Sequence, residues 1–392
     1  MEVKPKVETF ARIKVLGVGG SGTNAVNRMT ELGIKGVEFV SINTDAQALH
    51  NNQADRKVHI GKNITKGLGS GMNPELGRQA AEESVEELEE VIDNADMIFI
   101  TCGLGGGTGT GAAPIVAELA KNKGVLTVAV VTKPFTFEGS KRKEISEVGY
   151  DNLKDKVDAI ISIHNDRILQ IIDKKTSLID AFKTVDEVLR QGISGISDLI
   201  TTHGVVNADF ADVRSIMQDA GTALMGIGRA SGENRAEEAA KAAINSPLLE
   251  LAVDGARGVL FNITGGSNLG MFEIDEAAKV ITKSIDPDAK VKFGAVIDES
   301  MGDEVRITVI ATGFDEGNKR PPMQIMEEPK RAPVKEQTSF VHQQPAMEVR
   351  KPLFNPKPIE PVQPAEKPKV EESNSADEEE LDIPAFIRKK MK

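Results

Sequence analysis

The chain has 392 residues, 40% of them hydrophobic, and a formal net charge of -12, so it is long enough for two domains of ordinary size. The negative charge and the aromatic content of 4% argue against a protein that binds nucleic acid through phosphates or stacked bases. The single cysteine, Cys102, excludes an internal disulfide framework and fits a reducing compartment; without a signal-peptide core or an apolar run of ~18 residues, direct membrane insertion is not expected.

A glycine-rich loop follows the first predicted strand, 12–17, and opens an amphipathic helix. The loop reads Gly17-Val-Gly19-Gly20-Ser21-Gly22, which matches the GxGxxG pattern of dinucleotide-binding folds. Asp45 follows a second predicted strand, 37–43, about twenty residues further on, where a ribose-binding acid would lie. Alone, this pattern favours NAD or FAD as the ligand, and therefore an oxidoreductase, but a single GxGxxG is weak evidence.

A second glycine loop, 66–71, follows a possible strand at 57–60. This loop is either part of a ligand site or an ordinary surface turn, and the residues leave both alternatives open. Asn73 and Pro74 are typical of an N-cap and a first helical position. We therefore expect a long acidic helix from there to about Val91.

The most unusual stretch is GLGGGTGTGAAP at 103–114, which follows an apolar run at 97–100. We expect it to open a helix that has Pro114 in its first turn. Six glycines and two threonines offer backbone N–H groups and hydroxyls instead of charged side chains. Bare N–H donors in front of the positive end of a helix dipole form an anion site, so we expect a polyphosphate to bind here.

Strands and helices alternate up to about residue 175, and the run at 125–131 is apolar throughout, as in a parallel strand buried on both faces. This alternation predicts an α/β fold, an open, doubly wound sheet of the Rossmann type. Ligands of such sheets bind beyond the carboxyl ends of the strands. The first glycine loop and the loop at 103–111 both follow strands, so they can line one pocket.

Polar residues follow the next two strands. Glu138 could accept hydrogen bonds from ribose hydroxyls and Arg142 could meet a phosphate, or both could belong to a solvated helix start. Asn165 follows a predicted strand at 159–163. The five histidines show no metal-ligand spacing, so a zinc site is not expected.

The longest helical pattern runs from 176 to 202, with Ser177 as its cap and Gly204 as its end. Phe182 and Asp186 are one turn apart on this helix. A ring can stack on a purine, and a carboxylate can accept hydrogen bonds from N1–H and the 2-amino group of guanine. The pattern alone favours the simpler alternative, a core phenylalanine and a surface aspartate.

Asn207, Asp209 and Asp212 crowd the loop after this helix. Paired acids can place a water molecule for hydrolysis, or they can form an Asx turn and a helix N-cap. About 27 residues, roughly 40 Å of helix, separate Phe182 from the loop. If Phe182 touches the base, these carboxylates are either structural or act on a nucleotide held by a neighbouring subunit, and such a head-to-tail contact builds filaments.

The remaining pattern predicts a smaller α+β domain with strands at 223–229, 258–264, 291–298 and 305–311 and helices at 235–244 and 275–285. Beyond Gly317 the chain is rich in Pro, Glu, Lys and Gln and cannot bury enough apolar surface to fold. Ile383, Phe386 and Ile387 then form a short apolar motif near the end, which favours a docking peptide over a frayed terminus.

These residues together resemble the tubulin/FtsZ family of polymerising GTPases. GGGTGTG at 105–111 is similar to the family signature, and the residues at 19–24, 207–212 and 382–386 are similar to FtsZ rather than to tubulin. The resemblance covers 10–314 and the terminal peptide. It implies GTP or GDP as ligand, Mg²⁺ carried by the phosphates with no metal site of the protein's own, and GTP hydrolysis in head-to-tail filaments of the cell-division ring.

The resemblance also implies roles for single residues. Asp209 and Asp212, with Asn207, would complete the site of the next subunit and polarise its water, and Cys102 would be a buried small residue where many relatives have alanine. Together with Asp45, the predicted nucleotide-binding residues are Gly19, Gly20, Ser21, Gly22, Thr23, Asn24, Gly69, Gly71, Gly103, Gly105, Gly106, Gly107, Thr108, Gly109, Glu138, Arg142, Asn165, Phe182 and Asp186.

We thus expect six parts: a flexible N-terminus (1–10), a GTP-binding domain (11–175), a central helix (176–203), an α+β domain (204–317), a disordered linker (318–380) and a peptide (381–392). The peptide would bind membrane tethers and regulators of a cytoplasmic ring at mid-cell. The alternatives are the dinucleotide oxidoreductase and a scaffold that binds nucleotide without hydrolysing it.

Overall fold

A mostly parallel sheet organises the described residues of the computed structural model, which are 11–34, 36–173, 175–202, 204, 206–249, 253 and 255–314. They belong to one compact unit that spans residues 1–324. The predicted N-terminal segment, linker and terminal peptide lie outside the described residues.

The sheet has ten strands in the order β3-β2-β1-β4-β5-β6-β7-β10-β8-β9 within the described residues. The seven strands β3-β2-β1-β4-β5-β6-β7 run parallel to one another. Strand β10 is antiparallel to both β7 and β8, and β8 is parallel to β9. The strands are β1 Ile13–Val18, β2 Val37–Asn43, β3 Arg56–His59, β4 Met97–Gly103, β5 Leu126–Lys133, β6 Ala159–His164, β7 Gly221–Ser231, β8 Gly258–Gly265, β9 Lys290–Ile297 and β10 Glu304–Thr312. The predicted α/β class is confirmed.

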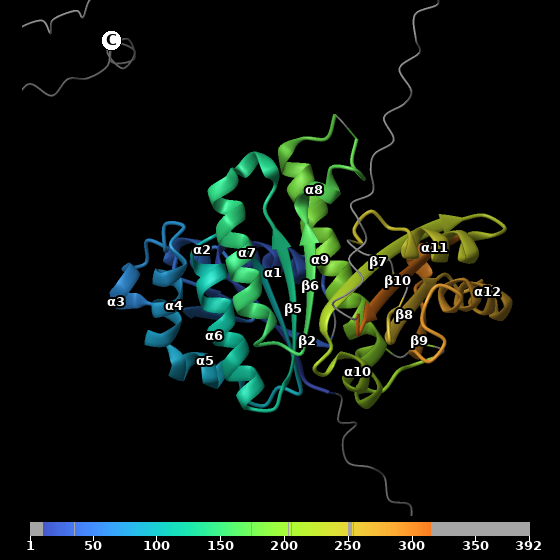
Figure 1. Ribbon diagram of the computed structural model, residues 1–392, viewed down its shortest axis with the longest axis horizontal. Helices are drawn as coiled ribbons and strands as arrows, with labels where there is room; N and C mark the ends of the chain where they lie inside the picture. The colour runs from blue at the N-terminus through green and yellow to red at the C-terminus, as the bar shows by residue number, and fades with distance from the viewer. Residues whose placement is uncertain are drawn as a thin grey trace, which may run out of the picture. The chain divides into compact units, whose positions relative to one another are not determined.

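Helices cover both faces of the parallel part because alternate strand residues point to opposite sides. On one face, Val15, Phe99 and Val128 pack with α1 (Gly19–Glu31) and α9 (Leu178–Thr201). On the other face, Leu16, Ile98 and Ala129 pack with a second group of helices. That group consists of α4 Pro74–Glu83, α5 Val85–Ile92, α6 Thr108–Asn122 and α7 Ser140–Lys154 (Figure 1). Every residue of β5 is buried, as predicted for a strand covered on both sides.

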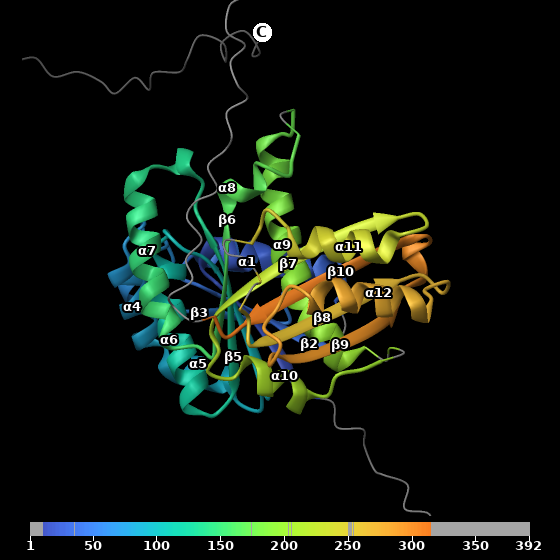
Figure 2. The ribbon, with the colours of Figure 1, turned by 45° about the vertical axis from the view of Figure 1, so that its right-hand side comes forward.

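The long helix α9 begins where its cap predicts. The Ser177 side chain accepts a hydrogen bond from the Asp180 N–H. The apolar stripe is buried from Val185 onward, whereas Leu178 is 60% exposed because the first turn extends beyond the core. Figure 2 shows α8 (Asn165–Ile168) and α10 (Phe210–Met217) at opposite ends of α9.

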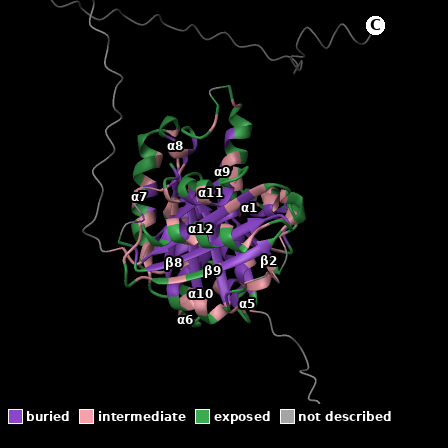
Figure 3. Ribbon diagram, turned by 90° about the vertical axis from the view of Figure 1, so that its right-hand side faces the viewer, coloured by how far each residue is buried: buried purple, intermediate pink, exposed green. Residues whose placement is uncertain are grey.

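Two helices, α11 (Arg235–Ile244) and α12 (Met271–Thr282), cover one face of the last four strands. Helix α11 lies directly on β7, because a Cβ on Gly228 would come within 1.9 Å of the Ala239 carbonyl oxygen. Figure 3 shows this part from the side, with buried strands behind helices whose outer faces are exposed. The short helices are α2 Ala46–His50, α3 Lys62–Thr65, η1 Thr136–Glu138 and η2 Glu299–Met301.

Three predicted helix boundaries are wrong. The predicted acidic helix does not continue to Val91 in one piece but breaks at Ser84. The buried Ser84 hydroxyl accepts a hydrogen bond from the Gly61 N–H, 3.3 Å away. Helix α6 starts at Thr108, so Pro114 lies inside it and not in its first turn. Helix α12 starts at Met271, one turn before the predicted Asp275.

None of the helices among the described residues combines the length and the apolar character that a membrane-crossing helix needs.

Candidate active site

Two adjoining cavities open at the carboxyl ends of β1 and β4, the edge where ligands of such sheets bind. Their volumes are about 340 and 250 Å³, and Ser21, Gly103 and Arg142 line both. Together they form one elongated site, with a glycine-rich part at one end and an aromatic residue, Phe182, at the other.

The glycine-rich part is built from the start of α6. The Gly105 N–H donates to the Thr110 hydroxyl at 2.9 Å, and Gly105 has a φ of +94°, which favours glycine. These contacts fold the loop back on the first turn of α6, whose leading N–H groups have no partner within the helix. The loop therefore presents backbone donors and the positive end of the α6 dipole to the cavity.

The first glycine loop, 17–22, touches the loop at 103–111, which is called the signature loop below. A Cβ on Gly19, which has a φ of +73°, would lie 2.6 Å from the Gly109 nitrogen. Helix α1 starts at Gly19, so two helix N-termini face one cavity. Gly22 and Thr23 are buried beneath the loop, where a Cβ on Gly22 would come within 2.3 Å of the Thr101 carbonyl oxygen.

The loop at 66–71 is part of the site and not a plain surface turn. Gly69 and Ser70 line the smaller cavity. The Ser70 hydroxyl lies 2.8 Å from that of Thr108, and the Thr44 hydroxyl lies 2.6 Å from the same oxygen. This buried trio of hydroxyls joins the loop to the start of α6.

Asp45 lines the same cavity, and its carboxylate also caps a helix. Its Oδ1 accepts hydrogen bonds from the N–H groups of Gln47 and Ala48 and caps α2. The sequence predicts a ribose-binding acid at this position, and the structure shows that Asp45 also serves as the N-cap of α2.

At the other end of the site, Glu138 and Arg142 form an ion pair at 2.8 Å. Arg142 Nε and Asn165 Oδ1 are buried and have no hydrogen-bond partner within the described structure. Unpaired buried polar atoms are costly and rare. Both residues line the larger cavity, although these two atoms themselves are buried.

The structure contradicts the simpler alternative of a core phenylalanine at 182 and a surface aspartate at 186. Phe182 is 41% exposed and its ring meets the edge of Phe135 at 5.5 Å, whereas the Asp186 side chain is only 19% exposed. Burial raises the pKa of Asp186 to about 6, and the Arg28 guanidinium, 3.3 Å away, opposes this only in part. A half-exposed ring and a carboxylate one turn apart thus line the same wall of the cavity.

Asn207, Asp209 and Asp212 do not line these cavities. They belong to the segment 204–212, here called the carboxylate loop, which follows the end of α9 and includes the first turn of α10 (Figure 2 shows α10 at that end). Asp209 caps α10 by accepting the Asp212 N–H at 2.7 Å, and the Asn207 amide oxygen accepts the Gly204 N–H at 2.7 Å. The Asp212 carboxylate is 30% exposed and pairs with Lys292 at 2.7 Å. The Asx-turn and N-cap alternative thus describes Asn207 and Asp209, but not the Asp212 side chain.

The structure gathers most of the predicted nucleotide residues at the two cavities. Those that line them are Gly20, Ser21, Asn24, Asp45, Gly69, Gly103, Gly106, Gly107, Thr108, Gly109, Glu138, Arg142, Asn165, Phe182 and Asp186. Gly19, Gly22, Thr23, Gly71 and Gly105 support the loops without lining the cavities. Asn43, Thr44 and Thr132 also line the cavities but were not predicted from the sequence. They lie at or next to the carboxyl ends of β2 and β5, and this position was the available signal. Ser70 lies between Gly69 and Gly71, within the loop that the resemblance assigns to the γ-phosphate.

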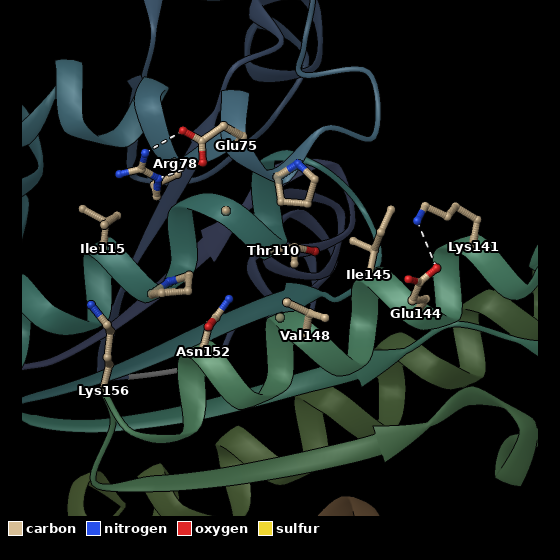
Figure 4. Close-up of a pocket in the computed structure, with 14 residues that line it drawn as sticks. Glu75, Arg78, Thr110, Ile115, Lys141, Glu144, Ile145, Val148, Asn152 and Lys156 are labelled. Carbon is tan, nitrogen blue, oxygen red and sulfur yellow. Dashed lines mark hydrogen bonds and ion pairs between the residues drawn. The ribbon is translucent and has the colours of Figure 1, made fainter.

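A third cavity of about 420 Å³ lies between α4, α6 and α7 (Figure 4). None of the predicted nucleotide residues lines it. Four of its charged lining residues form two ion pairs, Arg78 with Glu75 and Lys141 with Glu144, and Lys156 pairs with Glu118 outside the cavity. Its floor includes Thr110, whose hydroxyl holds Gly105, so this cavity backs the signature loop.

Cys102, at the end of β4, is buried, and burial raises the pKa of its thiol to about 12. The expectation of a buried small residue is confirmed. Among the described residues, no group of three or more His, Cys, Asp or Glu side chains could hold a metal ion.

The sequence matches two family domains. Residues 12–173 match the GTPase domain of the tubulin/FtsZ family, and residues 221–315 match the C-terminal domain of the FtsZ family. Among solved structures, the chain is similar to an empty FtsZ dimer from M. jannaschii, with 46% identity, a TM-score of 0.75, and coverage of 78% of this chain and 89% of that one.

Two other similar structures come from Haloferax volcanii. CetZ2, as a GTPγS-bound protofilament, is 21% identical, with a TM-score of 0.67 and coverage of 79% of this chain and 95% of that one. CetZ1, as a GDP-bound monomer, is 22% identical, with the same TM-score and coverage of 78% and 95%. At these identities the likeness supports the fold alone.

We predict that Gly107→Ala destabilises the nucleotide-free protein by about 1–3 kcal/mol, because overpacking a close contact forces the backbone apart. The new Cβ would lie 2.3 Å from the Ser70 hydroxyl and 2.8 Å from the Asn73 nitrogen. Gly106→Ala is the matched control, since its Cβ would meet nothing closer than 3.9 Å. Urea unfolding of both variants without nucleotide checks this, and equal stability of the two would contradict the proposed contact between the loops.

Proposed function

The chain belongs to the FtsZ family of tubulin-like GTPases, so it binds and hydrolyses GTP and polymerises, and we propose which of its residues carry out each step. This membership decides against the dinucleotide oxidoreductase and the non-hydrolysing scaffold.

The triphosphate lies in the glycine-rich cavity in this proposal. Gly20 to Asn24 and Gly105 to Gly109 hold it through backbone N–H groups at the starts of α1 and α6. Gly69, Ser70 and Gly71 face the γ-phosphate, and the hydroxyl contact between Ser70 and Thr108 connects that loop to the signature loop. The single observation that carries the proposal is the convergence of two helix N-termini and three loops on one cavity.

Guanine and ribose occupy the other cavity. The half-exposed Phe182 ring stacks on the purine, and the Asp186 carboxylate accepts hydrogen bonds from N1–H and the 2-amino group. Adenine lacks this pair of donors, so the Asp186 carboxylate would keep its ion pair with Arg28 but lose both hydrogen bonds to the base, which favours guanine. Asn24, Asn165, Glu138 and Arg142 bind ribose and phosphate groups around them.

A nucleotide held in this way cannot meet Asp209 or Asp212 of its own subunit. Helix α9 has 24 residues and is therefore about 36 Å long, and it separates Phe182, in its second turn, from the loop beyond its end. We infer that the loop completes the site of the next subunit. A contact between opposite ends of two copies does not close on itself, so it propagates as a filament.

Hydrolysis by such a site is mainly a matter of positioning and of charge stabilisation. Asp212, whose carboxylate is partly exposed, orients and polarises the attacking water, while Asp209 caps α10. Asn207 fixes the start of the loop through Gly204. The sequence has no GxxxxGK[ST] motif and so no P-loop lysine, and backbone donors supply the positive field.

Mg²⁺ bound to the phosphates would add to this field by neutralising charge. Mg²⁺ prefers oxygen ligands and keeps several of its water molecules, so phosphate and water oxygens would hold the ion in this proposal.

We further propose that 11–175 forms the GTP-binding domain, 176–203 the central helix and 204–317 the smaller domain. The linker at 318–380 and the peptide at 381–392 lie outside the described residues. In this proposal the peptide binds membrane tethers and regulators of division, and the filaments act in the cytoplasm at the mid-cell ring.

We predict that the affinity for GDP falls as the pH drops through about 6. The pKa of Asp186 is raised to about 6, so a growing fraction of its carboxyl groups is protonated below that pH and no longer accepts both guanine donors. Asp186→Asn cannot titrate and serves as the control for protonation of the phosphates. The dissociation constant of GDP, measured for both proteins from pH 5 to 8, checks this, and superimposable profiles would contradict it.

We predict that Asp212→Ala binds GTP with unchanged affinity but hydrolyses it at least about a hundredfold more slowly, because groups that position water contribute factors of 10² to 10⁴. GTP binding and phosphate release, measured on the same sample, separate the two effects. Full turnover by this variant would show that the catalytic assignment is wrong.

A further inference from the structure

Lys292 lies in the third position of β9, and its ammonium group contacts the carboxylate loop. Its Nζ atom is 2.7 Å from Asp212 Oδ1. The two residues are 80 positions apart in the chain, so only the fold brings them together. Nothing in the proposed nucleotide site uses Lys292.

Strand β9 also holds the start of the same loop. Val206 and Ala295 form an isolated bridge, with N···O distances of 2.9 and 3.4 Å in the two directions. Gly204 packs so closely on this strand that a Cβ would come within 2.4 Å of the Ala295 carbonyl oxygen. Both ends of the loop, near Gly204 and at Asp212, are thus fixed to one strand.

The carboxylates of this loop would repel a neighbour's triphosphate, and the positive charge of Lys292 would reduce this repulsion. Asp209 and Asp212 are both acidic, and their proposed target is the triphosphate of a neighbouring subunit, which is strongly negative. Like charges repel, and the repulsion grows as water leaves the interface. The hydrogen bond and charge of Asp212, with a contribution from Asp209, raise the pKa of Lys292, so the lysine stays charged near neutral pH.

We propose that Lys292 is a positioning residue for GTP hydrolysis, which holds the Asp212 carboxylate in one orientation and offsets its charge when the loop meets the neighbour's triphosphate. The inference deepens the proposed function and rests on the role given there to Asp212. Lys292 acts through that carboxylate and does not touch the nucleotide.

A purely structural role for this pair is a poor alternative. The side chains are 46% and 30% exposed, and ion pairs as exposed as this contribute little to stability. The same pair becomes more important when a second subunit covers it, since the interaction strengthens as water is excluded. Loss of Lys292 should therefore affect turnover in filaments and leave the isolated subunit intact.

The test compares full-length Lys292→Met with Lys290→Met and Lys292→Arg. Lys290 is exposed, lies two residues earlier on the same strand and makes no ion pair with Asp212 in the described structure, so its variant is the matched control. At saturating GTP and protein, we expect kcat to fall about tenfold in Lys292→Met, while the melting temperature and the GTP dissociation constant of the unassembled subunit stay unchanged. Such a loss is the size expected when a supporting residue is removed. Lys292→Arg should recover most of the rate and Lys290→Met all of it.

A double-mutant cycle with Asp212→Asn shows whether Lys292 acts through Asp212. We expect Lys292→Met to have no further effect on the residual rate of Asp212→Asn. An equal fractional loss in both backgrounds would overturn the inference, because the lysine would then act without that carboxylate. Wild-type turnover by Asp212→Asn would overturn the proposed function, whereas an inactive Asp212→Asn beside a fully active Lys292→Met would overturn only this inference.

Discussion

Helix α9, which has 24 residues and is mostly buried from Val185 to Leu199, separates Phe182, in its second turn, from Asp212, in the helix α10 beyond its end. The helix is rigid because its apolar stripe from Val185 to Ile196 packs in the main core. The wall that we propose binds the base therefore depends on the first turns of this helix, and the position of the carboxylate loop depends on its last turn. Because neither end can reach the other, GTP hydrolysis by this protein becomes a property of two subunits in contact.

Close backbone contacts set the shape of the nucleotide cavity. The signature loop touches the first glycine loop at Gly19 and Gly109, and it touches the second glycine loop, 66–71, at Gly107 and Ser70. A Cβ at Gly19 would come within 2.6 Å, and one at Gly107 within 2.3 Å, of an atom in the neighbouring loop, so either would push apart the loops of the proposed phosphate site. Space requires glycine at 107, and both space and a positive φ require it at 19. The cavity offers N–H donors where a different nucleotide-binding fold would use a lysine.

The sequence predicts the order of the strands and helices well, because alternating burial and glycine-rich turns are local signals. It also identifies most residues that line the cavities, since polar residues follow strand ends at one edge of the sheet. It fails where a contact joins distant segments. The hydroxyl trio of Thr44, Ser70 and Thr108 and the pair of Lys292 with Asp212 leave no local pattern. The break at Ser84 likewise depends on a hydrogen bond to Gly61, 23 residues earlier.

The shared active site is tested most directly by the rate of GTP hydrolysis measured against protein concentration, with light scattering recorded in parallel. If the carboxylate loop completes the site of the next subunit, the rate per subunit is close to zero at low concentration. It then rises steeply at the same concentration at which scattering begins. A rate per subunit that stays constant over the whole range, including below the onset of scattering, would contradict the account.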